Sequence, residues 1–387
     1  MADLLIEGNC DPRFARVREA FAENFAQRGD VGAAVAVTID GRPVIDLWGG
    51  FADKARTRPW TRDTIVNVYS ATKGVAATCI NRLADQGRID LDAPVARYWP
   101  EFAQAGKGKI LVRWLLSHRA GLPAVRKPLP SDALLHWDLM ATSLAEQEPW
   151  WEPGTKHGYH ALTLGYLLGE LLKRLTGKTI GAYCREELSG PLALDFHIGL
   201  IASEHSRCAE VIASPVSTAP PANMPAGADD PASVTMKAVN NPPGALKLSM
   251  INSRPWRAAE IPAANGHTNA RALARFYGVL ARGGEQDGVR VLSPAQIEQC
   301  YQEQSNGSDA VMFGLPSRFG LGYRLTQPAA KYGPNPHTFG HTGAGGSLAF
   351  ADPDAKLGFA YTMNQMGPHI LIDPRAVALL DALYGSL

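Results

Sequence analysis

A serine and a lysine stand three positions apart in the segment VYSATKGVA, at Ser70 and Lys73. The segment follows a possible strand, TIVNVY, and precedes a helical apolar pattern, so both side chains would share one side of the first helical turn. A lysine amine can take the proton of a serine hydroxyl if burial or another cation lowers its pKa. Serine is also a common helix N-cap, so this spacing alone allows either a catalytic pair or a helix start.

Other catalytic arrangements have weaker support in the sequence. No G-x-S-x-G occurs, so the nucleophile turn of the α/β-hydrolases is not indicated. His118, His160 and His341 could each serve a Ser-His-Asp triad, but neither their order nor their spacing selects one of them. His157 and His160 could also ligate a metal. No HExxH sequence or partner cluster accompanies them, and we expect neither a metal nor a cofactor.

Two further segments carry residues that could take part in catalysis. In WWEPGTKHGYHALTLGYLL, Tyr159 lies between a Pro-Gly turn and a helix expected from about Leu162. A tyrosine there could point into a cleft and handle protons if nearby cations lower its pKa from ~10, or it could be a packed aromatic. In FGHTGAGGSLAFADP, three glycines follow His341-Thr342 at the start of a strand. Backbone N–H groups at such an edge could stabilise an oxyanion, and a bulge or tight turn is the alternative.

The elements that must position these residues are strands at the two chain ends and helices between them. Two β-rich runs flank Asp40-Gly41, a strong hairpin signal, and GGSLAFADPDAKLGFAYTMN predicts two strands joined at residues 352–354. Helices are predicted over residues 12–28 and in the closing segment DPRAVALLDALYGSL. The strands are expected to pair in one antiparallel sheet covered by helices. From Ala71 to about residue 180 most segments have apolar residues at helical spacing, so helices are predicted there.

The totals exclude several classes of protein. The 387 residues exceed the about 250–300 at which one core stops growing, so two lobes are expected. With 38 basic and 37 acidic residues and no basic face, nucleic acid is not an expected partner. No apolar run could span a bilayer, and the start does not resemble a signal peptide. Five scattered cysteines without a CxxC pair suggest neither disulfides nor zinc, so we expect a reduced, cytoplasmic protein.

The motifs SATK, PGTKHGYHA and HTGAGG occur in a fixed order, and in this order the sequence resembles the serine β-lactamase and penicillin-binding-protein superfamily. It is most similar to the class C β-lactamase-related esterases, the family VIII carboxylesterases. The segments GRIDLDAPVARYWPEF, LLSHRAGLP, NGHTNARALARFYGVLARGG and FGLGYRL match the same family. The resemblance runs from about residue 12 to the end and is weakest across 200–260.

The resemblance implies an α/β (α+β) fold of the β-lactamase/transpeptidase type. Residues 1–75 and 262–387 would form a lobe with an antiparallel sheet flanked by helices. Residues 76–261 would form an inserted, mostly helical lobe, and the active site would lie in the cleft between the lobes. That insert includes residues 214–246, rich in Pro, Ala, Ser and Asn, which we expect to be an ordered excursion near the cleft.

The resemblance also implies roles for individual residues. Ser70 would attack the substrate carbonyl and become acylated, and Lys73 and Tyr159 would form the proton-handling pair around it. Either of these two could be the base, because a cationic Lys73 would lower the pKa of Tyr159 whereas a neutral Lys73 would itself accept the proton. The backbone N–H groups of Ser70 and Ala344 would form the oxyanion hole, and water would deacylate the enzyme.

Departures from the family pattern bear on the substrate. The second motif is often Tyr-x-Asn, but here Ala161 replaces the asparagine that would orient a substrate amide. The third is usually Lys-Thr-Gly, but here His341 replaces the permanent cation with an imidazole, largely neutral at pH 7. His341 and Gly343 are expected beside the substrate. An apolar acyl pocket is expected from Tyr69, Trp256 and Phe339, each of which could equally be a core residue.

These features favour a cofactor-free carboxylesterase for small or short-acyl esters, with weak side activity on β-lactams such as cephalosporins. The alternatives are a genuine β-lactamase or D-alanyl peptidase, against which Ala161 and His341 argue, and an acyltransferase in which an alcohol replaces water. A non-catalytic binding protein is the least favoured, because Ser70, Lys73 and Tyr159 are all retained. The natural ester and the oligomeric state are not specified by the sequence.

Overall fold

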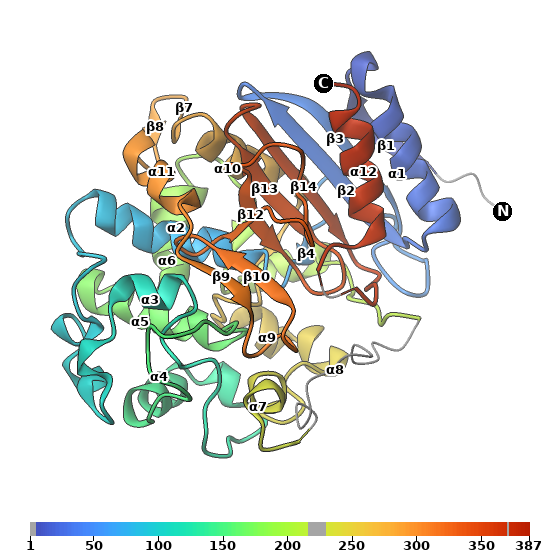
Figure 1. Cartoon of the computed structure of the whole chain (residues 1–387). Helices are drawn as coiled ribbons and strands as arrows, with labels where there is room; N and C mark the ends of the chain where they lie inside the picture. Colours follow the sequence, from blue (N-terminus) through green and yellow to red (C-terminus); the bar gives the residue numbers. More distant parts are fainter. Residues whose placement is uncertain (1–4, 216–229, 370) are drawn as a thin grey trace.

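The computed structural model describes residues 5–215, 230–369 and 371–387. Its centre is a nine-stranded antiparallel sheet in the order β1-β3-β2-β14-β13-β12-β11-β10-β9 (Figure 1). The strands are β1 (Ile6–Cys10), β2 (Gly32–Ile39), β3 (Arg42–Gly50), β9 (Ser305–Ser308), β10 (Pro316–Phe319), β11 (Arg324–Leu325), β12 (Phe339–Thr342), β13 (Leu348–Asp352) and β14 (Leu357–Met363). The two ends of the chain meet where β2 pairs with β14, in a register that sets Ala36 opposite Ala360. The predicted antiparallel sheet built from both chain ends is therefore confirmed.

Short turns set the register of this sheet. Asp40 and Gly41 join β2 to β3 with φ values of 49° and 77°, the left-handed pair that a two-residue hairpin requires. The segment after Asp352 turns β13 into β14, with Lys356 at a φ of 51°. Both turns lie where the Asp-Gly and Asp-Pro-Asp sequences predicted them.

Helices cover both faces of the sheet. On one face α1 (Ala15–Gln27) and α12 (Pro374–Tyr384) lie side by side, blue and red in Figure 1, and bury Phe21 and Leu379 against Val35 and Phe359. On the other face α10 (Ala270–Ala281) packs on β2 and β14. A Cβ on Gly358 of β14 would lie 2.2 Å from the backbone nitrogen of Gly278 in α10, so this close approach requires glycine.

The middle of the chain is mostly helical and gathers beside the sheet (Figure 1). Its helices are α2 (Thr72–Asp85), α3 (Val112–Leu116), α4 (Trp137–Glu146), α5 (Thr163–Thr176), α6 (Ile180–Cys184), α7 (Val234–Asn240), α8 (Leu248–Ile251) and α9 (Arg254–Ala258). The central one is α2, which is buried at every position from Thr72 to Asn81 and packs against α5, α6 and β12. One hydrophobic core runs from these helices to the sheet. The division into two lobes at the predicted boundaries stays a prediction.

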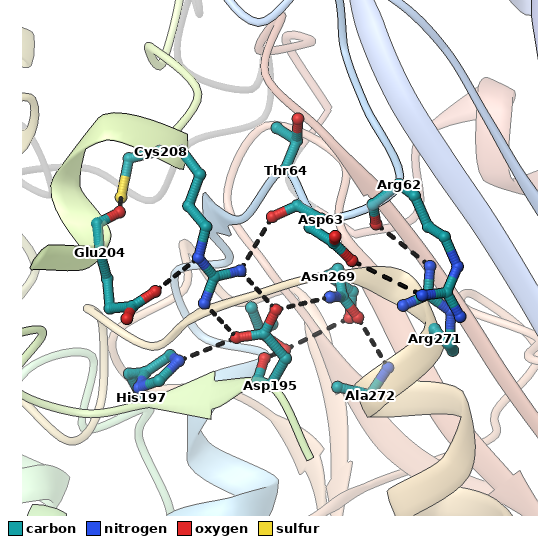
Figure 2. Close-up of polar contacts among 12 residues, drawn as sticks. Arg62, Asp63, Thr64, Asp195, His197, Glu204, Cys208, Asn269, Arg271 and Ala272 are labelled. Carbon is teal, nitrogen blue, oxygen red and sulfur yellow. Dashed lines mark hydrogen bonds and ion pairs between the residues drawn. The ribbon is translucent and has the colours of Figure 1, made fainter. Parts of the chain in front are cut away.

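A small three-stranded sheet of β4 (Val66–Asn67), β6 (His267–Thr268) and β5 (Phe196–His197) leads into the Ser70 segment. Asp195 fastens this sheet to the start of α10, as Figure 2 shows. It accepts hydrogen bonds from Arg207 at 2.6 and 2.7 Å and from Asn269, the N-cap of α10, at 2.9 Å. Burial raises the pKa of Asp195, but hydrogen bonds from Arg207 and His197 outweigh burial and lower it to about 2. This network links the small sheet to α10, and β4, which leads to Ser70, pairs with β6 of the same sheet.

No helix among the described residues is both long and apolar enough to cross a membrane.

Candidate active site

Ser70 lies one residue before the N-cap of α2. The N-cap is Ala71, which makes no side-chain capping bond, so Ser70 does not cap the helix. Thr72 fastens the turn instead, accepting from the backbone nitrogen of Gly266 at 2.8 Å and donating to the Tyr69 carbonyl. Tyr69 has a φ of 45°, a left-handed conformation that bulky residues rarely adopt and that often marks functional sites. The turn leaves Ser70 partly exposed beside a buried helix.

Lys73 is fully buried one turn into α2 and points at Ser70. Its Nζ lies 3.0 Å from Ser70 Oγ, 2.7 Å from the Ala161 carbonyl oxygen and 2.8 Å from that of Ala263. Burial, and then the nearby Arg324 guanidinium, lower the pKa of Lys73 well below its usual value. A neutral amine has two N–H bonds and one lone pair. The two carbonyls can accept both N–H bonds, which leaves the lone pair for the Ser70 hydroxyl.

Tyr159 completes the group around Ser70. Its ring centroid lies 4.8 Å from Lys73 Nζ, and its backbone nitrogen donates to Asp309 Oδ1 at 3.0 Å. Burial raises the pKa of Tyr159 to about 12, against the opposing effects of Arg324 and of a hydrogen bond with Ser70. The phenol is therefore protonated at neutral pH, whereas the lysine favours its neutral form. The structure thus brings together the three residues that the sequence motifs selected.

Buried polar groups hold the Tyr159 segment in place. Asp309 Oδ1 accepts from the backbone nitrogens of Val311 and Met312 as well as that of Tyr159. The backbone nitrogen of His160 donates to His118 Nδ1 at 3.1 Å. Sequence reasoning did not single out Asp309, because its partners are up to 150 residues away in the chain.

The histidines do not form a Ser-His-Asp triad with Ser70. Burial lowers the pKa of His160 to about 4, and its ring nitrogens pair with the Gly158 carbonyl and the Leu122 backbone nitrogen. Burial also lowers the pKa of His118 well below its usual value. Within the described residues, no histidine hydrogen-bonds to Ser70, whose hydroxyl is partnered by Lys73 and Tyr159.

The glycine turn after β12 lies against the Ser70 segment. A Cβ on Gly343 would lie 2.2 Å from the Val68 carbonyl oxygen, so only glycine permits this contact. The backbone N–H groups of Ser70 and Ala344 donate to no other group in the described part of the chain, so both could donate to an oxyanion. Arg375 of α12 supports the turn from behind, donating from Nη2 to the Gly345 carbonyl at 2.8 Å.

His341 on β12 occupies the position of the usual cation of the third motif. Its Nδ1 lies 2.6 Å from the Thr342 carbonyl oxygen, so Nδ1 carries the proton and Nε2 is the acceptor. Nε2 is buried without a hydrogen-bond partner in the described structure. Burial first, then Arg324 and Lys73, lower the pKa of His341 well below its usual value. The imidazole is therefore neutral.

The aromatic residues proposed to line an acyl pocket are placed differently by the structure. Trp256 and Phe339 are fully buried in the main core, where Trp256 donates to Asn67 Oδ1 and Phe339 packs against Tyr323. Their side chains pack inside the core and do not line a pocket beside Ser70. Tyr69 is also buried, with its hydroxyl 3.5 Å from the Met366 sulfur, although it directly precedes the nucleophile.

A different apolar cluster lies next to Tyr159. A small core that includes Tyr159 and Phe319 lies at its centre. The partly buried residues that pack against this core are Trp150, Trp151, Ala161, Val234 and Met312. Val234 belongs to α7, within the predicted excursion 214–246, and Thr235 of the same helix donates to the Val311 carbonyl at 3.0 Å. The described part of the excursion from residue 230 therefore lies beside the site. Residues 216–229 lie outside the described residues.

Arg324 on β11 is the charged residue of the site that sequence reasoning missed. Its side chain is buried, and the guanidinium carbon lies 4.9 Å from the ring centroids of both Tyr159 and Phe319. The sequence GLGYRL carries no signal for this role, because it depends on strand pairing with β12.

Comparison with known proteins shows which family the chain belongs to. A family model described as Beta-lactamase matches residues 17–382. Esterase/beta-lactamase LipL of Mycobacterium tuberculosis is 40% identical over 371 residues, covering 95% of this chain and 85% of that protein. A crystal structure of a family VIII carboxylesterase matches with a TM-score of 0.91 at 44% identity, over 99% of this chain and 100% of that chain. A penicillin-binding protein homologue from Caulobacter crescentus matches with a TM-score of 0.90 at 42% identity, over the same shares of the two chains. The chain therefore belongs to the β-lactamase family, as the order of its three motifs predicted.

Proposed function

We propose that the protein is a carboxylesterase that hydrolyses esters of small or short-chain acids through an acyl-enzyme on Ser70. The observation that carries the proposal is the pairing of a partly exposed serine with a fully buried lysine, 3.0 Å apart. The similarity to LipL and to the family VIII carboxylesterase supports the reaction class.

In the proposed acylation, neutral Lys73 takes the proton of the Ser70 hydroxyl as Oγ bonds to the ester carbonyl carbon. The hydrogen-bonding capacity of Nζ is satisfied before and after the transfer, because Ser70 and two carbonyls surround it in both states. The carbonyl oxygen becomes an oxyanion between the N–H groups of Ser70 and Ala344. As the bond to the alcohol breaks, the protonated Tyr159 phenol supplies a proton to the leaving alkoxide and regains one from Lys73.

Water then attacks the acyl-enzyme by the reverse sequence. It gives a proton to the same pair, and Ser70 leaves as the free hydroxyl with release of the acid. No cofactor takes part in the proposed cycle. The partners of the protein are small ester molecules, and neither nucleic acid nor a membrane is part of the proposal.

The substrate proposal rests on the two departures from the family motifs. Ala161 presents a methyl group and neutral His341 presents no positive charge, so neither matches the amide or the carboxylate of a peptide or β-lactam. The apolar cluster beside Tyr159 suits a short hydrocarbon acyl chain. A secondary activity on cephalosporins is included, because β-lactam opening uses the same acylation step and LipL is named for both activities.

We also place the enzyme in the cytoplasm. All five cysteines are free thiols, two of them, Cys79 and Cys184, neighbours in the core, which fits a reducing compartment.

The test compares wild type with Ser70→Ala on p-nitrophenyl esters from acetate to decanoate and on a chromogenic cephalosporin. We expect wild type to prefer the short esters, to turn over the cephalosporin slowly, and to lose both activities in Ser70→Ala. Full ester hydrolysis by Ser70→Ala would disprove the nucleophile. Cephalosporin turnover far above that of any ester would show that the substrate class is wrong.

A further inference from the structure

Arg324 is a buried cation that has no counter-ion among the described residues. It is 6% exposed, and its guanidinium makes no ion pair or hydrogen bond with any residue that the structure describes. Its Nε is buried without a partner. The comparably buried Arg375 pairs with the carboxylates of both Asp30 and Asp373, which is the usual way to bury an arginine. An unpaired buried charge lowers stability, so its position calls for a functional reason.

The surroundings of Arg324 point to the catalytic pair. Its guanidinium carbon lies 4.9 Å from the Tyr159 ring centroid, and Lys73 Nζ lies 4.8 Å from the same centroid. Phe319 stacks on Tyr159 with the rings 7° from parallel and also contacts the guanidinium, which holds the arginine in place. Arg324 pairs with Gly340 on β12, so it enters the site one residue along the strand from His341.

We propose that Arg324 is the fixed positive charge of this active site, a positioning residue that acts on Ser70 through Lys73 and Tyr159. It supplies from β11 the permanent cation that the third motif lacks at His341. The inference deepens the proposed ester hydrolysis and rests on the acylation chemistry assigned to Ser70.

The electrostatic effect of Arg324 has a definite sign. A neighbouring cation disfavours a charged Lys73 and favours a neutral one, which can act as a base. Burial has the largest effect in lowering the pKa of Lys73, and Arg324 adds to it. For Tyr159 the same charge opposes burial, which raises the phenol pKa, and so eases transient phenolate formation.

The other ionisable groups near the pair do not replace this charge. Burial is the main cause that lowers the pKa values of four nearby histidines, so their rings are neutral. These histidines are His118, His157, His160 and His341. The Asp309 carboxylate behind Tyr159 has the opposite sign and raises the pKa of Tyr159. Arginine is the side chain that carries a permanent positive charge in proteins.

The test measures how fast Ser70 reacts with a fluorophosphonate probe as a function of pH, with intact mass as the readout. In that reaction Ser70 Oγ bonds to phosphorus, fluoride leaves, and the hydroxyl proton passes to Lys73. The variants are Arg324→Gln, Arg324→Met and Arg324→Lys. Arg318→Gln is the matched control, because Arg318 lies on the neighbouring β10 but pairs with Glu303 near the surface.

We expect labelling at pH 7 to fall roughly tenfold or more in Arg324→Gln and Arg324→Met, with the midpoint of the pH profile about one unit higher, since the removed charge no longer depresses the Lys73 pKa. Arg324→Lys should keep most of the wild-type rate, and Arg318→Gln should match wild type. Arg324→Met should melt at or above the wild-type temperature, because an apolar side chain suits a buried site better than an unpaired charge.

An unchanged pH midpoint in both neutral variants would overturn the proposal. So would a loss confined to the KM of esters that carry a carboxylate, which would make Arg324 a substrate-binding group instead. Equal losses of stability and labelling in Arg324→Met, with no change in pH midpoint, would show a purely structural role. If wild type reacts with the probe but hydrolyses no ester, the proposed function fails and the pH profiles still decide the role of Arg324.

Discussion

Replacing Arg375 with methionine would show how far the C-terminal helix controls the proposed oxyanion hole. Arg375 donates from Nη2 to the Gly345 carbonyl and from Nη1 to the Gln365 carbonyl, both at 2.8 Å. The same guanidinium pairs at 2.8 Å with Asp30 and with Asp373. Methionine fills a similar volume but leaves two buried carboxylates without a cation. Breaking a buried pair in this way destabilises a protein by about 3–5 kcal/mol.

The loss of stability in Arg375→Met should depend on pH in a defined direction. Burial already raises the pKa of Asp30, and Arg375 is the first of the groups that oppose it. Removing the arginine raises that pKa further, so the folded variant binds a proton that the unfolded chain releases above about pH 4. A carboxyl with a raised folded pKa loses stability as the pH increases through the interval between its unfolded and folded values. The difference from wild type should therefore be smaller at pH 5 than at pH 7.5.

Urea unfolding at the two pH values measures the difference in stability between Arg375→Met and wild type. Kinetics with p-nitrophenyl esters measure the effect of the substitution on the site. Because the Gly345 turn also carries the Ala344 N–H, we expect kcat to fall about 10- to 100-fold with little change in KM. Arg271→Met is the control, because Arg271 forms a half-buried pair with Asp46 at 2.7 Å and should contribute no more than about 1 kcal/mol. A fully stable Arg375→Met, or one that loses stability but keeps its kcat, would refute the link between this network and the oxyanion hole.

Three further substitutions test single contacts. Tyr159→Phe keeps the ring against Lys73 but removes the hydroxyl, so kcat should fall about 10²-fold or more at an unchanged unfolding midpoint; near-normal turnover would remove Tyr159 from the mechanism. Gly343→Ala would set a Cβ 2.2 Å from the Val68 carbonyl oxygen and should lower kcat up to about 10²-fold, whereas Gly108→Ala, with its nearest neighbour at 3.9 Å, should not; equal kinetics of the two variants would contradict the turn geometry. His341→Ala should change the ratio of kcat/KM between short and long esters more than kcat itself, and a uniform kcat loss across the series would argue against a substrate-facing role.

The sheet was predictable where local sequence sets the geometry. Asp40-Gly41 favours the left-handed φ values of a tight hairpin, and the turn after Asp352 is similarly local. The pairing of β2 with β14 could be expected because both are long, buried runs, and each has a hairpin partner on only one of its two sides. Among the short strands, β4 lies within the run TIVNVY that the sequence marked as a possible strand. β11 was not predictable, because a strand of two residues is defined by its neighbours rather than by its own period.

For the candidate site, residue type and order selected the residues that the structure brings together, but not their surroundings. Ser70 and Lys73 are one helical turn apart, so local geometry alone brings them together. Trp256 and Phe339 lie close in sequence to site segments, yet both are in the core, because proximity along the chain does not say which face a side chain uses. Asp309, which fixes the Tyr159 backbone, comes from a segment that shares no motif with it.

The placement of charge explains why the substrate was harder to predict than the nucleophile. From the sequence, His341 removes a cation, and the simplest expectation is a site with less positive charge. In the structure Arg324 is buried on the adjacent strand, so a positive charge lies 4.9 Å from the Tyr159 ring centroid rather than on β12. A lysine on β12 would bind a substrate carboxylate and also influence Lys73. Under our proposal for Arg324, separating these two effects would keep Lys73 neutral and leave the β12 edge free for uncharged substrates, which is the combination that an esterase needs.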